Sequence, residues 1–281
     1  MRLIKTIADL KLELKSHWKS KTLIGFVPTM GALHEGHLGL VKKALEENEV
    51  VVASIYVNPT QFNNAEDLKN YPRTLAEDLE KLKKTGCSMA FVPSNEEIYD
   101  KSFKFKHVEL NALDEVMEGK FRPGHFMGVV NVVQRLLDLV KPNNAYFGKK
   151  DFQQLAVINA MRNQLNLKVN IVACETQRDH DGLALSSRNL LIDPTLMKDA
   201  YAIYNVFQLG LDLVNTCTPK EAAQKMKDKL NQSRLSLEYL EIVDPNKLKP
   251  IAKWVPGATV CVAAYCGKVR LIDNFELIAQ K

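Results

Sequence analysis

The sequence predicts an α/β fold, a doubly wound parallel sheet followed by a second, smaller α+β domain. Short apolar runs alternate with segments of helical periodicity over the first two-thirds of the 281 residues, as expected for βαβ units. Residues 50–57 form a nearly continuous β-branched run, which is typical of a strand buried on both faces of a sheet. Beyond about residue 176, two amphipathic helical patterns precede three strand-like runs, an order that favours a small α+β domain. We therefore expect two domains, residues 1–176 and residues 177–281.

The first domain is expected to alternate parallel strands with helices. Apolar runs predict strands at residues 23–27, 50–57, 89–92, 145–147 and 169–174. Periodic segments predict helices at residues 38–47, 74–84, 126–140 and 152–165. Thr74 and Glu77 have the spacing of a capping box, which indicates a helix N-terminus at Thr74. Ligands of such sheets bind beyond the carboxyl ends of the strands.

The second domain is expected to follow a polar join at residues 175–181. Asp193-Pro194 and Thr218-Pro219 each pair an N-cap residue with proline at the first helical position. They predict helices at residues 195–214 and 220–232. Apolar runs then predict strands at residues 237–243, 259–265 and 269–272.

Composition and charge favour a cytoplasmic protein that handles small anionic molecules. The net charge is only +5, and no run of five basic residues occurs, so a nucleic-acid partner is not expected. The five cysteines form no C-x-x-C pair, which favours a reducing compartment. No segment resembles a signal peptide or a membrane span, so we expect no membrane partner.

The most informative motif runs from Gly25 to His37, where an apolar strand breaks into a glycine-containing turn and a helix begins. Backbone N–H groups and the helix dipole attract anions at such a junction. The imidazoles of His34 and His37 can donate to phosphate oxygens as pyrophosphate leaves. The motif therefore indicates an ATP site. Two other interpretations stay open here: a zinc pair, because residues three apart share a helix face, and a solvated helix cap.

Other polar clusters follow predicted strands or the domain join. Asn58 and Gln61 come after the strand at residues 50–57, where Gln could recognise a carboxylate, although a plain Asn-Pro turn also explains them. Arg122 offers a fork of donors for a carboxylate or phosphate, and the nearby His125 could be a simple helix cap.

Two more clusters could contact a triphosphate. Residues 149–154, Lys-Lys-Asp-Phe-Gln-Gln, follow a predicted strand and supply cations, a carboxylate and two amides. Residues 186–188, Ser-Ser-Arg, follow the domain join and could wrap the phosphates. A solvated turn and a polar linker are the simpler interpretations, and no His–Asp relay marks either serine as a nucleophile.

Taken together, these motifs resemble those of the pantothenate synthetase (pantoate–β-alanine ligase) family, within the nucleotidylyltransferase superfamily that carries His-x-Gly-His. The matching blocks occur in family order and spacing at residues 28–37, 57–62, 71–74, 122–128, 147–154 and 181–189. The last hundred residues match in layout only. The resemblance implies a Rossmann-like domain that binds ATP and pantoate, with the C-terminal domain acting as a lid.

The resemblance also implies the reaction of an AMP-forming acid–amine ligase. ATP, accompanied by Mg²⁺, and (R)-pantoate would form pantoyl-adenylate and pyrophosphate. β-Alanine would then attack the adenylate, release AMP and yield pantothenate, a precursor of coenzyme A. A homodimer is implied as well.

Site residues follow from the resemblance by position in its motifs. Those that would bind ATP are Met30, Gly31, Ala32, Leu33, His34, Glu35, Gly36, His37, Gly148, Lys149, Lys150, Asp151, Gln177, Leu185, Ser186, Ser187 and Arg188. Catalytic roles in stabilising phosphate charge would fall to His34, His37, Lys150 and Arg188, with His37 as proton donor. Gln61 and Gln154 would hold pantoate, and Gln61 would also meet β-alanine. Asn58, Tyr71 and Arg122 would help to position the substrates. No residue is expected to ligate a metal, because the phosphates of ATP would hold Mg²⁺.

The chain departs from the family pattern at three places. Lys149 stands where Glu or Gln is usual and adds positive charge near the expected phosphates. Residues 177–180 and 63–65 also differ from the usual residues, which leaves affinity and loop closure open. Two other classes of function stay open too: a nucleotidylyltransferase that transfers NMP to a phosphorylated alcohol, and a non-catalytic nucleotide-binding protein. A tRNA-charging fragment is less favoured, because no anticodon-binding region is evident.

Overall fold

The computed structural model describes residues 1–100 and 102–278, and the chain divides into two compact units. Unit 1 comprises Met1–Asn111, Arg122–Lys149 and Gln154–Glu175. Unit 2 comprises the chain from Thr176 onward together with two short segments, Ala112–Phe121 and Lys150–Gln153. Both segments precede residue 176 in the sequence, yet they are built into the second unit.

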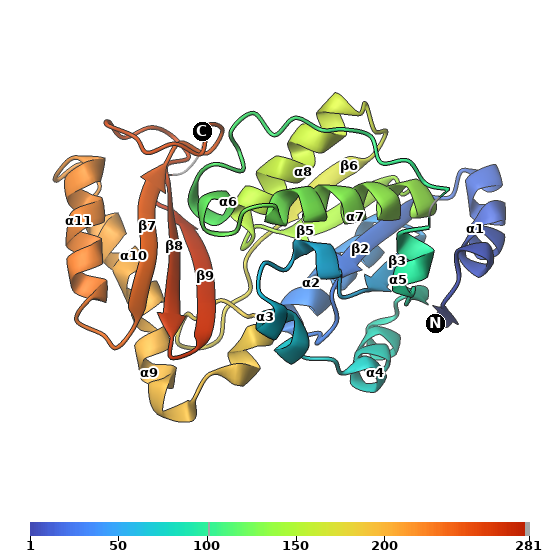
Figure 1. Cartoon of the computed structure of the whole chain (residues 1–281), viewed down its shortest axis with the longest axis horizontal. Coiled ribbons are helices and arrows are strands. Elements are labelled where there is room, and N and C mark those ends of the chain that lie inside the picture. The colour runs from blue at the N-terminus through green and yellow to red at the C-terminus, as the bar shows by residue number, and fades with distance from the viewer. Residues whose placement is uncertain (101, 279–281) are drawn as a thin grey trace. The chain divides into compact units, whose positions relative to one another are not determined.

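Unit 1 is organised around a six-stranded sheet in the order β1-β4-β3-β2-β5-β6, in which every recorded strand pair is parallel (Figure 1). The strands are β1 (Arg2–Ile4), β2 (Ile24–Thr29), β3 (Val50–Ile55), β4 (Met89–Phe91), β5 (Asn144–Gly148) and β6 (Asn170–Cys174). The five predicted strands are confirmed to within two residues at each end. The sequence did not indicate β1, a short strand at the sheet edge.

The strand order reverses between β2 and β5. From β2 the chain adds β3 and β4 on one side, and β5 and β6 then extend the sheet on the other side of β2. Ligands of doubly wound sheets bind at such a reversal, beyond the carboxyl ends of the strands. The residues that directly follow Thr29 and Gly148 are therefore the ones placed for binding.

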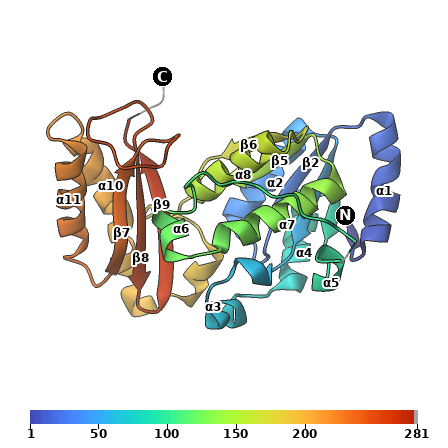
Figure 2. The same cartoon turned by 45° about the horizontal axis from the view of Figure 1, so that its top comes forward.

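Helices cover both faces of this sheet. They are α1 (Ile7–Ser20), α2 (Glu35–Glu47), α3 (Ala65–Asn70), α4 (Leu75–Thr85), α5 (Asn95–Ile98), α7 (His125–Val140) and α8 (Phe152–Gln164). Helix α2 packs on β2, β3 and β5 and against α4, whereas α7 crosses β2 on the other face and packs against α1 (Figures 1 and 2). Alternate residues of β2 serve the two faces, and both Phe26 and Val27 are fully buried.

The predicted capping box at the start of α4 is wrong. Thr74 is the N-cap residue, but its side chain makes no capping hydrogen bond. Its hydroxyl donates instead to Asp78 Oδ1 at 3.2 Å. The charged carboxylate of Asp78 is buried one turn further along the helix and is a strong hydrogen-bond acceptor. The Thr74 hydroxyl therefore points to Asp78, and no capping box forms with the exposed Glu77.

Unit 2 contains an antiparallel sheet of β7 (Ser236–Val243), β8 (Thr259–Cys266) and β9 (Val269–Glu276). Helices α10 (Ala202–Leu213) and α11 (Pro219–Leu230) pack against each other on one face of it (Figure 2). Thr218 and Glu221 form a reciprocal capping box at α11, which confirms the helix start predicted there. The short helix α6 (Met117–Phe121) belongs to this unit as well.

The single helix predicted at residues 195–214 is wrong, because the segment is divided into three. The 3-10 helix η3 (Pro194–Leu196) is capped by Asp193 as expected, and it leads into α9 (Met197–Ala200) and then α10. Apolar periodicity continues through both breaks, so the pattern alone did not reveal them. The last strand is also longer than predicted and reaches Glu276.

None of the helices within the described residues combines the length and the apolar character needed to span a membrane. All five cysteines are free thiols. Burial raises the pKa of the Cys87 thiol to about 11, so it behaves as a small apolar core residue rather than as a nucleophile.

Candidate active site

The conformation of the turn between β2 and α2 is stabilised by a buried carboxylate. Gly31 and Ala32 both adopt positive φ angles, 84° and 49°, which reverse the chain directly after the strand. Asp78, which is 1% exposed, accepts the N–H groups of Ala32 (2.9 Å) and Leu33 (2.7 Å). Positive φ at Ala32 is unfavourable for a residue with a Cβ, so these hydrogen bonds stabilise a strained backbone.

The expected anion site at this turn therefore needs a correction. We expected its backbone N–H groups to face phosphate, but those of Ala32 and Leu33 are committed to Asp78. The prediction of an anion site now depends on the first turn of α2 alone, where the helix dipole is positive. Lys81 donates to the Leu33 carbonyl (2.7 Å) and so also binds the backbone of this turn.

The two histidines lie together at the N-terminus of α2. His34 is the N-cap residue with extended backbone, and His37 is the third helical residue. Their ring centroids are 4.0 Å apart, and the His34 N–H donates to His37 Nδ1 over 3.4 Å. Because Nδ1 accepts this N–H, a neutral His37 ring would carry its proton on Nε2. The cap and the phosphate interpretations are thus compatible, since an N-cap residue lies at the end of a helix where the dipole attracts anions.

Gln61 is fixed from both its side chain and its backbone. It ends the 3-10 helix η1 (Pro59–Gln61) just beyond β3 and is 8% exposed. Its Nε2 donates to Met30 Sδ (3.0 Å), and its Oε1 accepts from Asn58 Nδ2 (3.2 Å). The amide predicted to recognise pantoate therefore touches the first residue of the predicted ATP motif.

Asn58 and Tyr99 support that amide from behind. Asn58 is almost fully buried and also donates to the Gly128 carbonyl (3.1 Å). Burial raises the pKa of Tyr99, so its hydroxyl stays protonated and donates to Asn58 Oδ1 (2.7 Å). The sequence did not single out Tyr99, because it follows α5 some forty residues away from the motif it supports.

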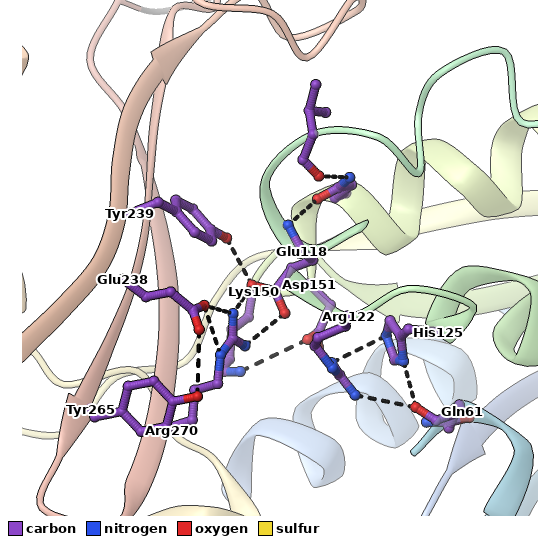
Figure 3. A network of polar contacts seen from close by, with 12 residues as sticks. Gln61, Glu118, Arg122, His125, Lys150, Asp151, Glu238, Tyr239, Tyr265 and Arg270 are labelled. Atoms are coloured by element: carbon purple, nitrogen blue, oxygen red, sulfur yellow. Dashed lines mark hydrogen bonds and ion pairs between the residues drawn. The ribbon is translucent and has the colours of Figure 1, made fainter. Parts of the chain in front are cut away.

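Arg122 and His125 hold the backbone of the same residue. His125 Nδ1 donates to the Gln61 carbonyl (2.7 Å), and Arg122 Nη2 reaches the same oxygen (3.3 Å) (Figure 3). Arg122 Nη1 also donates to His125 Nε2 (3.2 Å). His125 is thus a support for Gln61 rather than the simple helix cap that the sequence suggested. Tyr71, another predicted positioning residue, is buried edge-on against Phe62.

Unit 1 also contains predicted residues at the end of β5 and beyond it. Gly148 is the last residue of that strand, and Gln154 lies in the first turn of α8. Lys149 forms an ion pair with Glu175 of the same unit. The extra positive charge that departs from the family pattern is therefore balanced by a neighbouring carboxylate.

The remaining predicted phosphate ligands all belong to unit 2. Lys150 lies beside Asp151, with 3.9 Å between Nζ and Oδ1, and its carbonyl accepts from Asn274 Nδ2 (2.8 Å). Ser186 caps the 3-10 helix η2 (Ser187–Leu191) by accepting the Arg188 N–H (3.3 Å). Gln177 and Leu185 belong to the same unit, and the Leu185 N–H donates to the Gln177 carbonyl (2.9 Å).

Sequence reasoning missed a buried charge cluster in unit 2. Arg270 of β9 forms two hydrogen bonds with Glu118 of α6 (2.8 and 2.7 Å) and also binds Glu238 (Figure 3). Tyr239 donates to the same Glu118 carboxylate (2.8 Å), and burial raises the pKa of its hydroxyl well above the usual value. Gln153 accepts the Glu118 N–H (2.9 Å). Nothing local in residues 112–121 signals these contacts, because their partners lie as far as 152 positions away.

The chain was compared with known proteins and structures. The family model described as pantoate-beta-alanine ligase matches residues 2–276. The pantothenate synthetases of Bacteroides thetaiotaomicron and Porphyromonas gingivalis are 44% and 45% identical over 279 residues, 98% of this chain and 99% of each relative.

Solved structures give the same result. The pantothenate synthetase of Thermus thermophilus has a TM-score of 0.93 and 41% identity, with 99% of this chain and 100% of that chain covered. The pantoate-beta-alanine ligase of Francisella tularensis, complexed with beta-gamma ATP and beta-alanine, has a TM-score of 0.83 and 38% identity over 99% of this chain and 98% of that chain. On these matches and the site geometry, the chain belongs to the pantothenate synthetase (pantoate–β-alanine ligase) family.

Proposed function

We propose that this chain condenses (R)-pantoate with β-alanine to form pantothenate, in two steps driven by ATP. In the first step the pantoate carboxylate attacks the α-phosphorus of ATP, which forms pantoyl-adenylate and releases pyrophosphate. In the second step the β-alanine amine attacks the acyl carbon, an amide bond forms, and AMP leaves with the electron pair of the broken anhydride bond. Neither step needs a nucleophile from the protein.

The contact between Gln61 and Met30 carries this proposal. A pantoate carboxylate can attack only if it lies within about 3–3.5 Å of the α-phosphorus. Gln61 Nε2 lies 3.0 Å from the sulfur of Met30, at the start of the predicted ATP motif. An amide here can bind pantoate without adding negative charge, next to a helix end that attracts phosphate. Positioning of the two reactants contributes about 7–11 kcal/mol to such reactions.

In the first step, the polar residues would offset the negative charge of the phosphates and of the pantoate carboxylate. His34 and His37 would donate to the phosphate oxygens whose charge grows as pyrophosphate leaves. Lys150, Arg188, Ser186 and Ser187 would neutralise and bind the same phosphates, Asp151 would organise the nucleotide, and Gln154 would assist Gln61 with pantoate. Loss of one well-placed donor to developing charge costs about 3–4 kcal/mol.

Mg²⁺ is proposed to accompany ATP. The described part of the chain contains no group of three or more His, Cys, Asp or Glu residues able to hold a metal ion. We propose that the phosphate oxygens of ATP hold the ion, where it would neutralise their charge. The homodimer, the cytoplasmic location and the lid role of residues 177–281 rest on the sequence and its resemblance, and they stay predictions.

A product assay tests the reaction. The protein is incubated with ATP, Mg²⁺, pantoate and β-alanine, and AMP, pyrophosphate and pantothenate are quantified. We expect equal amounts of AMP and pantothenate, and no sustained AMP release when β-alanine is omitted. Pyrophosphate without AMP would instead support NMP transfer, and no product at all would support a non-catalytic nucleotide-binding protein.

Gln61→Ala tests the substrate assignment within this reaction. We expect it to raise the KM for pantoate while the Kd for ATP stays unchanged, because the amide is assigned to the acid. Gln164→Ala is a matched control in unit 1, since the Gln164 amide binds the backbone of Glu109 and accepts its N–H at 3.0 Å. Loss of ATP binding in the Gln61 variant would show that the amide is assigned to the wrong substrate.

A further inference from the structure

Strand β9 contains two adjacent residues, Asp273 and Asn274, that the reaction scheme does not use and that together form an anchor. Asp273 is 4% exposed and binds Arg178 through both carboxylate oxygens. Arg178 Nη1 lies 2.6 Å from Oδ2, and Nη2 lies 3.1 Å from Oδ1. Such bidentate pairs fix both the position and the orientation of the guanidinium. The guanidinium is also enclosed by aromatic rings, with its carbon 5.3 Å from the centroid of Tyr204.

Arg178 ties a tight loop to this anchor. It donates to the Gly182 carbonyl (3.0 Å) and to the Asn274 carbonyl (3.1 Å). The loop closes through a bridge between Arg178 and Ala184. A Cβ added at Gly182, where φ is 91°, would lie 2.1 Å from the ring of Tyr204. The loop therefore has little freedom, and the chain passes from it directly into residues 185–188.

Asn274 holds a second segment through the same anchor. Its Nδ2 donates to the Lys150 carbonyl (2.8 Å), and its backbone N–H donates to Asp273 Oδ1 (2.8 Å). Burial raises the pKa of Asp273, while the charges of Arg178 and Lys150 oppose that rise. Lys150 therefore interacts with the anchor in two ways: its charge acts on Asp273, and its backbone carbonyl binds Asn274. All these residues belong to unit 2.

We propose that Asp273 and Asn274 are positioning residues that hold Lys150 and the Ser186–Arg188 segment in one fixed arrangement. Asn274 sets the backbone from which the Lys150 side chain extends, and Asp273 sets the loop that leads to residues 186–188 through Arg178. The inference rests on the proposed function, because it requires these cations to act on the phosphates of ATP. Preorganised charges stabilise a transition state without reorganisation at the moment of reaction. A catalytic group misplaced by about 1 Å can cost about 10²-fold in rate.

A double-mutant cycle tests the link between Asn274 and Lys150. The variants are Asn274→Ala, Lys150→Met and the double variant, each made in the full-length chain. The readout is the single-turnover rate of pyrophosphate release with ATP, Mg²⁺ and pantoate, beside the Kd for ATP. We expect Asn274→Ala to slow the step by about 10²-fold, with a smaller change in Kd. In the Lys150→Met background the same change should have no further effect, because its only route of action is gone.

Two further variants separate positioning from general stability. Asp199→Asn breaks the exposed Arg234–Asp199 ion pair of the same unit, which contacts neither Lys150 nor the loop. This control should leave the rate unchanged. Arg178→Lys keeps the positive charge but lacks the planar fork, so we expect it to slow adenylate formation. Arg178→Met should slow it more, so that the lysine gives partial rescue.

The outcomes distinguish the inference from the proposed function. If Lys150→Met is slow and Asn274→Ala reacts at the wild-type rate, the inference is overturned and the proposed function stands. If Asn274→Ala slows both backgrounds by the same factor, Asn274 does not act through Lys150, and the inference is again overturned. If Lys150→Met itself reacts at the wild-type rate, the proposed role of Lys150 is refuted and the inference with it.

Discussion

Replacement of Asp78 by asparagine is expected to loosen the turn that carries the residues from Met30 to His37. The carboxylate accepts the N–H groups of Ala32 and Leu33 on different oxygens. In asparagine one of those oxygens becomes an NH₂ group. Whichever way the amide is oriented, one backbone N–H then faces a donor and loses its acceptor.

The magnitude follows from these contacts. A hydrogen bond to a charged group contributes about 1.5–3 kcal/mol, and a buried donor left unsatisfied costs about 1–3 kcal/mol. We therefore expect Asp78→Asn to lower the free energy of unfolding of unit 1 by about 3–5 kcal/mol. Glu80→Gln is the matched control, because Glu80 lies on the same helix in an exposed pair with Lys84, and such pairs contribute about 0–1 kcal/mol.

Tryptophan fluorescence can follow this unit separately. The chain has two tryptophans, Trp18 in unit 1 and Trp254 in unit 2. In a Trp254→Phe background, urea unfolding followed by fluorescence reports unit 1. A stability of Asp78→Asn within about 0.5 kcal/mol of the Glu80→Gln control would refute the reasoning, since surface substitutions stay in that range. A folded Asp78→Asn protein that forms adenylate at the normal rate would refute the claim that this turn positions the histidines.

Three other predictions concern the site and the helix ends. Gly128→Ala would place a Cβ 2.5 Å from the Thr60 carbonyl oxygen. Although alanine favours helices by about 1 kcal/mol, we expect a net loss of about 1–3 kcal/mol and a higher KM for pantoate, and a more stable variant would contradict this. His37→Ala should slow pyrophosphate release by about 10²–10³-fold, and an unchanged rate would return it to a purely capping role. Hydrogen bonds from Thr218, the N-cap residue of α11, lower the pKa of Glu221. The ionised Glu221 carboxylate therefore stabilises the folded state above the ordinary pKa of a glutamate, and this contribution is lost as the pH falls through the lowered pKa. The difference in urea midpoint between wild type and Glu221→Gln, read from Trp254, should therefore shrink from about pH 6 to about pH 3, and a constant difference would argue against it.

Buried strands were predictable because their signal is local. The runs that became β2, β3 and β5 are apolar on both faces and bounded by polar turns. The start of the chain lacks this signal. Strand β1 has only three residues, and α1 buries only Leu10 and Leu14 on one side. Weak burial leaves a weak pattern, so both elements escaped prediction.

The positions of the candidate site residues were predictable where these residues follow strand ends, and less so where distant partners hold them. His34, His37 and Gln61 each lie just past a buried strand, and the sequence placed them there. Asp78 looked like one more acid on a charged helix, because its partners lie 45 and 46 positions earlier. A local rule for helix capping gave the wrong bond for Thr74 for the same reason. Local sequence patterns cannot reveal which acidic residue of a charged helix is buried by tertiary contacts.

Lys150 shows how far this limitation reaches into function. In the sequence it follows β5 directly and belongs to the first two-thirds of the chain. In the structure it belongs to unit 2, where an asparagine 124 positions later binds its carbonyl. The groups assigned to phosphate are therefore divided: His34 and His37 lie at the N-terminus of α2 in unit 1, whereas Lys150 and residues 186–188 belong to unit 2. Because Asp273 and Asn274 are proposed to support the second set, substitutions at these two residues of β9 should affect the first chemical step as strongly as substitutions beside the histidines.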